Sequence, residues 1–118
     1  MNARKIVDIL LEDEDFDMED YALAALTPEE AYTMACTNPE LRPKLERVIA
    51  TDAGYSYSYA RHVLKGQFPA GEPALATDAY RAYDYAVFTG NRFPLAEPEI
   101  AKYIQLKQMY QHTFGVKL

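Results

Sequence analysis

The stretch Phe68-Pro69-Ala70-Gly71-Glu72-Pro73-Ala74-Leu75-Ala76 returns 25 residues further along the chain as Phe93-Pro94-Leu95-Ala96-Glu97-Pro98-Glu99-Ile100-Ala101. Seven of the nine positions are identical or conservatively replaced. A segment that returns at a fixed spacing of about 20–50 residues is typical of proteins built from stacked structural repeats. We therefore expect the 118-residue chain to form one domain, residues 1–118, made of repeated units.

Each unit is expected to begin with a helix. The expected starting residues are Asn2, Thr27, Asp52 and Asp78. All four have a short polar side chain that can accept a hydrogen bond from an unpaired N–H group in the first helical turn. Thr27 has the clearest signal, because Pro28 suits the first helical position and Glu30 completes the pattern of a capping box.

Large and small side chains recur at helical spacing after these starts. The fifth residues are Val7, Tyr32, Tyr57 and Tyr83, and the eighth residues are Leu10, Ala35, Ala60 and Ala86. Both positions lie on one face of a helix. We therefore expect this face to pack in the core, with Tyr57 and Tyr83 largely buried.

Each unit then breaks and continues into a second, shorter helix. Glycine, asparagine and proline mark the breaks near residues 37–39, 65–69 and 89–94, because these residue types end helices. The expected units are residues 2–26, 27–51, 52–77 and 78–101. Residues 97–114 contain no clear stop, which predicts one continuous capping helix. The predicted class is all-α, a short array of about four helix pairs that is solenoid-like or a compact bundle.

A strand is the alternative for the segment Tyr55-Ser56-Tyr57-Ser58-Tyr59, whose aromatic and polar residues alternate. The equivalent segment, residues 80–86, lacks this alternation but keeps tyrosine and alanine at helical spacing. Repetition across units outweighs local propensity, and we expect a helix here.

The composition predicts a folded domain, and the lack of targeting signals predicts a location in the cytoplasm. Apolar residues make up 49% of the chain and charged residues 25%, as in ordinary globular domains. The sequence contains neither a run long enough to cross a membrane nor the pattern of a signal peptide. Cys36 is the single cysteine, and we expect it to be a semi-buried packing residue rather than a nucleophile.

Negative charge is concentrated in residues 12–20. The acidic patch consists of Glu12, Asp13, Glu14, Asp15, Asp17, Glu19 and Asp20. The net charge of the chain is −6, because this segment carries −7 and the remaining residues sum to +1. Three of the aspartates have the spacing of a calcium loop, but Met18 and Ala24 stand where the loop requires glycine and glutamate. We expect a solvated charge run without a stoichiometric metal site, with weak and unselective binding of divalent cations as the alternative.

Catalytic signals are absent from the sequence. It holds no serine-hydrolase, zinc-protease or phosphate-loop motif, and His62 and His112 have no evident catalytic partners. Its basic residues are scattered, which disfavours direct nucleic-acid binding. We expect no enzymatic activity and no cofactor.

Residues 57–76 resemble a known type of repeat. Their Tyr-Ala, Leu-Lys-Gly-x-Phe-Pro and Gly-Glu-Pro elements are similar to the Tyr/Ala-rich repeats of about 25 residues in uncharacterised proteins of bacteriophages and large DNA viruses. The resemblance covers residues 51–101 and fades toward the first two units. It implies a helical repeat fold and a phage or viral origin, hence the host cell cytoplasm, and it implies no reaction.

Two classes of function follow. The first is a non-enzymatic interaction or structural module that binds a host or viral protein, or another copy of itself, along the stacked helices. The candidate binding residues are Tyr55, Tyr59, His62 and Tyr85, because aromatic rings on rigid helices are favoured anchors. The alternative is an acidic inhibitor of a host nucleic-acid-binding or defence system, in which residues 12–20 mimic phosphates. Neither class involves a membrane.

Overall fold

The protein is all-α. The computed structural model describes residues 3–12 and 16–118, and side chains from residues 4–11 and 18–118. Its helices are α1 (Ala3–Glu12), α2 (Phe16–Ala24), α3 (Pro28–Thr37), α4 (Arg42–Ile49), α5 (Ala53–Ser58), α6 (Glu72–Leu75), α7 (Ala79–Thr89), α8 (Glu97–Ile100) and α9 (Ile104–Phe114). Tyr59–Leu64 is a π-helical turn, and short 3-10 turns precede α4, α6 and α8. No strand occurs in these ranges, and the segment from Tyr55 to Tyr59 is helical.

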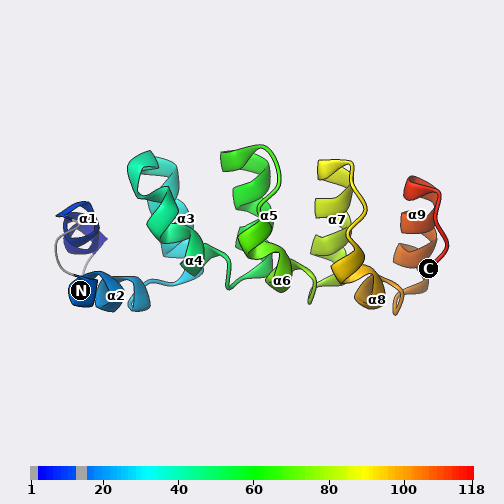
Figure 1. Ribbon diagram of the computed structural model, residues 1–118, viewed down its shortest axis with the longest axis horizontal. Helices are drawn as coiled ribbons and strands as arrows, with labels where there is room; N and C mark the ends of the chain where they lie inside the picture. The colour runs from blue at the N-terminus through cyan, green and yellow to red at the C-terminus, as the bar shows by residue number, and fades with distance from the viewer. Residues whose placement is uncertain (1–2, 13–15) are drawn as a thin grey trace.

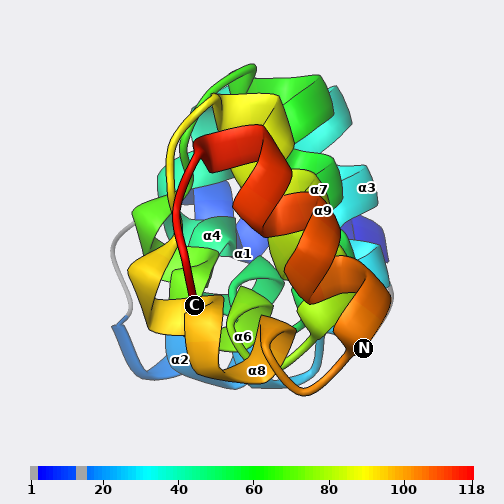
Figure 2. The same cartoon turned by 90° about the vertical axis from the view of Figure 1, so that its right-hand side faces the viewer.

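The helices form an elongated row. In Figure 1, α3, α5, α7 and α9 stand side by side. α4 descends beside α3, and the short α6 and α8 lie along the lower edge of the row. Figure 2 looks along the row, so that the successive hairpins overlap. The molecule measures 50 × 22 × 18 Å. Along the row, α3 contacts α5, α5 contacts α7 and α7 contacts α9.

Side-chain caps fix three of the predicted helix starts. Thr27 Oγ1 accepts a 3.1 Å hydrogen bond from the Glu30 N–H, and Glu30 Oε1 accepts one of 3.0 Å from the Thr27 N–H. Asp52 and Asp78 accept from the N–H groups of the third residues after them. These starts are confirmed. The expected start at Asn2 lies outside the described residues.

The third unit contains one additional residue. Asp52 and Asp78 are 26 residues apart, whereas Thr27 and Asp52 are 25 apart. The additional residue widens the helix after α5 into the π turn, where the Gly66 N–H donates to the Ala60 carbonyl at 3.0 Å. Lys65 ends the turn in the left-handed conformation with φ of 56°. A π turn accommodates an inserted residue without unwinding its neighbours.

The prediction of a continuous helix over residues 97–114 is wrong. α8 ends at Ile100, and the chain passes through an extended residue, Tyr103, before α9 begins. The backbone angles of Tyr103 (φ −113°, ψ 109°) resemble those of Asp78 (φ −121°, ψ 102°). α9 therefore begins as the first helix of each unit does. The sequence concealed this start because Tyr103 has no short polar side chain to act as a cap.

The buried face of the first helices is rotated from the predicted one, so that different tyrosines face the core. Ala60 and Ala86 are fully buried as expected, but Tyr57 and Tyr83 are only half-buried. The largest buried rings are instead Tyr59, Tyr85 and Tyr110, each seven residues after a helix start. This face turns toward the second helices.

Candidate functional site

The buried tyrosines form the joints between successive units. Tyr59, Tyr85 and Tyr110 donate hydrogen bonds to Glu46 (2.7 Å), Glu72 (2.7 Å) and Glu97 (2.5 Å), each thirteen residues earlier. Tyr59 and Tyr85 are therefore not available to a partner, and their assignment to the binding surface is wrong. Helical spacing placed them beside Tyr55, but the second helix of the preceding unit covers them.

Backbone groups complete two of these joints. The N–H groups of Phe68 and Phe93 donate to the hydroxyls of Tyr85 and Tyr110 at 2.9 and 2.8 Å. Burial, followed by the carboxylate bond, raises the pKa of Tyr85 above its ordinary value, and the same causes act on Tyr59 and Tyr110. These phenols hold their protons and serve a structural role.

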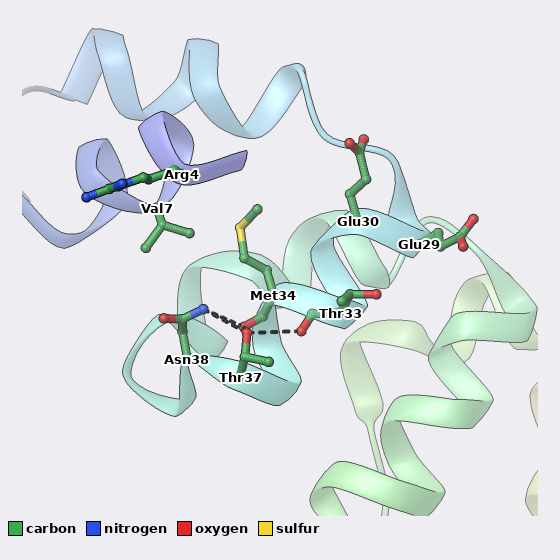
Figure 3. Close-up of a pocket in the computed structure, with 8 residues that line it drawn as sticks. All are labelled: Arg4, Val7, Glu29, Glu30, Thr33, Met34, Thr37 and Asn38. Atoms are coloured by element: carbon green, nitrogen blue, oxygen red, sulfur yellow. Dashed lines mark hydrogen bonds between the residues drawn. The ribbon is translucent and has the colours of Figure 1, made fainter. Parts of the chain in front are cut away.

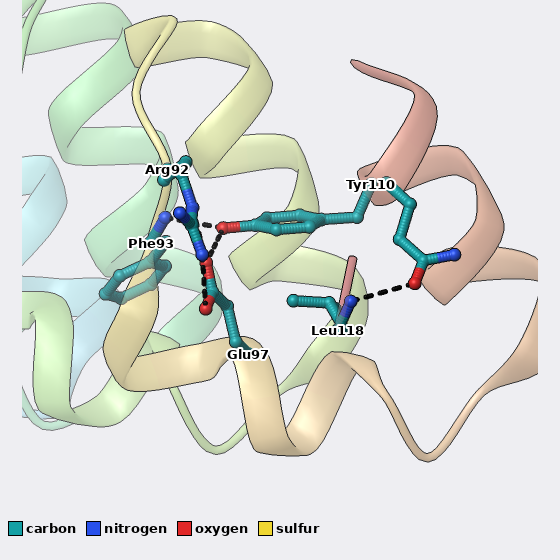
Figure 4. A network of polar contacts seen from close by, with 6 residues as sticks. Arg92, Phe93, Glu97, Tyr110 and Leu118 are labelled. Carbon is teal, nitrogen blue, oxygen red and sulfur yellow. Dashed lines mark hydrogen bonds and ion pairs between the residues drawn. The ribbon is translucent and has the colours of Figure 1, made fainter. Parts of the chain in front are cut away.

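Figure 4 shows the last joint, where an ion pair is added. Arg92 binds both carboxylate oxygens of Glu97 at 3.1 Å. Burial opposes ionisation of Glu97, but the hydrogen bonds from Arg92 and Tyr110 outweigh it, so the pKa of Glu97 lies below its ordinary value. The buried polar side-chain atoms described at this joint all have hydrogen-bond partners.

The first joint lacks this arrangement. Met34 occupies the tyrosine position, and Tyr21, 64% exposed, occupies the glutamate position. A groove of about 360 Å³ lies here between α1 and α3, lined by Arg4, Val7, Glu29, Glu30, Thr33, Met34, Thr37 and Asn38 (Figure 3). Glu30 caps the helix, and Thr37 and Asn38 bond to the Met34 carbonyl. Much of the polar lining of the groove between α1 and α3 therefore already forms hydrogen bonds within the chain.

An equivalent groove lies between α7 and α9. Its volume is about 240 Å³, and its lining residues are Tyr80, Tyr83, Asp84, Tyr103, Gln105, Leu106 and Met109. Tyr80 (61% exposed), Tyr103 (44%) and Met109 (48%) present large apolar surfaces to solvent. The rings of Tyr80 and Tyr103 touch, with centroids 5.7 Å apart. We call this site the α7/α9 groove and regard it as the candidate functional site.

The remaining predicted binding residues do not gather there. Tyr55 is half-buried and packs on Tyr32, with ring centroids 5.6 Å apart, and His62 is exposed on the π turn. Sequence reasoning missed Tyr80 and Tyr103. Tyr80 lies two residues after the start of α7, and Tyr103 lies at the start of α9. Their proximity can be recognised only when the sequence of α9 is aligned with that of α7.

The acidic patch is described only in part. Glu19 pairs with Lys44 at 3.1 Å and Asp20 with Arg47 at 2.7 Å. Glu12, Asp13, Glu14, Asp15 and Asp17 have side chains outside the described set. Cys36 is exposed, so its expected role as a semi-buried packing residue is wrong. It lies one position beyond the buried Ala35, on the outward side of α3.

The described ranges contain neither a metal-ligand cluster nor a helix that could span a membrane. No group of three histidine, cysteine, aspartate or glutamate side chains among the residues described could hold a metal ion. None of the described helices has the length and apolar character needed to cross a membrane. Comparison of the chain with protein-family models, curated proteins and solved structures found no match.

Proposed function

We propose that the protein is a non-enzymatic interaction module that binds a protein partner through the α7/α9 groove. The observation that carries this proposal is the joint exposure of Tyr80, Tyr103 and Met109 around one groove. Exposed apolar groups that lie together, rather than singly, mark interaction sites. Tyrosine and methionine are also enriched in protein interfaces.

The rigidity of the groove supports the same proposal. Its side chains project from two packed helices, and Leu106 beneath them is buried. A tyrosine held on a helix loses little rotamer freedom when it binds. The acidic alternative is less well supported, because Glu19 and Asp20 already pair with Lys44 and Arg47.

The test is affinity capture with matched variants. Tagged wild-type protein is compared with the Tyr80→Ala/Tyr103→Ala double variant and with Tyr21→Ala, whose ring is equally exposed but lies on α2. We expect the double variant to remain folded, because both side chains are exposed and neither belongs to the core. We also expect it to lose the partner that wild type and Tyr21→Ala retain.

Two outcomes would count against the proposal. Equal recovery of the same proteins by wild type and the double variant would remove the α7/α9 groove as the interface. Loss of the partner only after neutralisation of Glu19 and Asp20 would favour the acidic surface. Sedimentation of the same variants over a range of concentrations tests whether the partner is a second copy.

A further inference from the structure

We propose that the α7/α9 groove recognises the guanidinium of an arginine in the partner, held on its tyrosine rings and paired with Asp84. This inference deepens the proposed function by naming the chemistry of the partner's anchor. The groove combines three phenol rings with one carboxylate and has no basic side chain in its lining. Guanidinium groups bind to both the faces of aromatic rings and carboxylates.

Asp84 is the charged group of the site. It is exposed on α7, and no described residue forms an ion pair with it. Lys102, which precedes Tyr103 in the chain, binds Glu99 at 2.8 Å. An arginine that entered the groove would therefore meet an unpaired carboxylate beside apolar ring surface, an arrangement that favours a cation over a neutral side chain.

Between α5 and α7, the chain itself places such a cation on aromatic rings. The guanidinium of Arg61 lies 5.9 Å from the ring centroid of Tyr57 and 5.8 Å from that of Phe88. Arg61 also donates a 2.6 Å hydrogen bond to the Tyr57 hydroxyl. The molecule thus shows how a guanidinium sits between the first helices of two neighbouring units.

The α7/α9 groove has the same ring but lacks that arginine. Tyr57 and Tyr83 both lie five residues after their helix starts, whereas the position nine residues after the start is Arg61 in one unit and Val87 in the next. Val87 is exposed and carries no charge. The groove therefore has a counterpart of the Tyr57 ring, whereas Thr113 takes the place of Phe88. Its lining adds a carboxylate and contains no cation.

Nuclear magnetic resonance of the labelled full chain can test this assignment. The probes are Nα-acetylarginine amide and its neutral isostere Nα-acetylcitrulline amide, added at physiological ionic strength. We expect arginine amide to shift backbone amide signals of residues 80–84 and 103–109 with a Kd at least about fivefold lower than that of citrulline amide, as cation–π and carboxylate contacts require.

Variants separate this site from general attraction to acidic surfaces. Asp84→Asn and Tyr103→Ala should each weaken arginine binding about threefold or more, which is the scale of one such contact. Asp8→Asn is the matched control, because Asp8 is an exposed aspartate on α1. Its affinity for arginine amide should equal that of wild type.

The results distinguish this inference from the proposed function. Equal affinity for arginine and citrulline amides, or arginine binding that Asp84→Asn leaves unchanged, would overturn the guanidinium assignment. If the Tyr80→Ala/Tyr103→Ala variant still lost its partner, the proposed interaction surface would be supported even though the guanidinium assignment was wrong. Selective arginine binding with unchanged partner capture would instead support the cation site and remove the proposed interface.

Discussion

Replacing Tyr85 by phenylalanine tests the physical account of the joints between units. The change removes one hydroxyl and keeps the buried ring, so packing is preserved. That hydroxyl donates to Glu72 at 2.7 Å and accepts from the Phe68 N–H at 2.9 Å. A bond to a charged group contributes about 1.5–3 kcal/mol, and an unsatisfied buried N–H costs about 1–3 kcal/mol. Together these two effects give an expected loss of stability of about 2.5–6 kcal/mol.

Two further variants calibrate this value. Tyr59→Phe removes one bond, to Glu46, and should cost about 1.5–3 kcal/mol. Tyr83→Phe removes an exposed contact of 3.5 Å with Thr113 and should change stability by less than about 0.5 kcal/mol. Urea unfolding followed by far-UV circular dichroism gives the three free energies of unfolding. A cost for Tyr85→Phe no larger than that for Tyr83→Phe would refute the reasoning.

Three other predictions follow from packing and ionisation. Ala60→Leu places three more carbons at a fully buried position and should destabilise the fold by about 1–3 kcal/mol, measured as a lower Tm. Burial raises the pKa values of Tyr59, Tyr85 and Tyr110. The stability that these phenols contribute is therefore present below about pH 10 and lost as pH rises further. Tyrosinate absorbance and the circular dichroism signal of the folded protein should change together. The pKa of Glu97 is lowered, so its contribution is present above about pH 4.5 and lost as pH falls; Glu97→Gln should flatten the acid side of the stability profile.

Helix starts and the fold class could be predicted from sequence because their causes are local. Thr27, Asp52 and Asp78 each satisfy N–H groups within their own first turn. The break before α9 has no such cause. Tyr103 is extended and makes no side-chain cap hydrogen bond, so the pattern of cap residues does not reveal this helix start.

The residues of the candidate site were harder to predict from the sequence for a related reason. Helical spacing correctly grouped Tyr59 and Tyr85 but gave no indication of which side of the helix the preceding unit would cover. Glu46 and Glu72 decide this, since each accepts the hydroxyl of the tyrosine thirteen residues later. Recognising Tyr80 and Tyr103 as neighbours required the arrangement of α7 against α9.

The π turn of Tyr59–Leu64 lets one unit be a residue longer while its aromatic packing is unchanged. Tyr59 and Phe68 are nine residues apart, whereas Tyr85 and Phe93 are eight apart, yet the ring centroids lie at similar distances of 4.9 and 5.3 Å. The surplus residue is confined to one widened turn. A scaffold of this kind can gain a residue in one unit while every later hairpin keeps its orientation, so its outer surface is free to diversify at sites such as His62 without disturbing the joints.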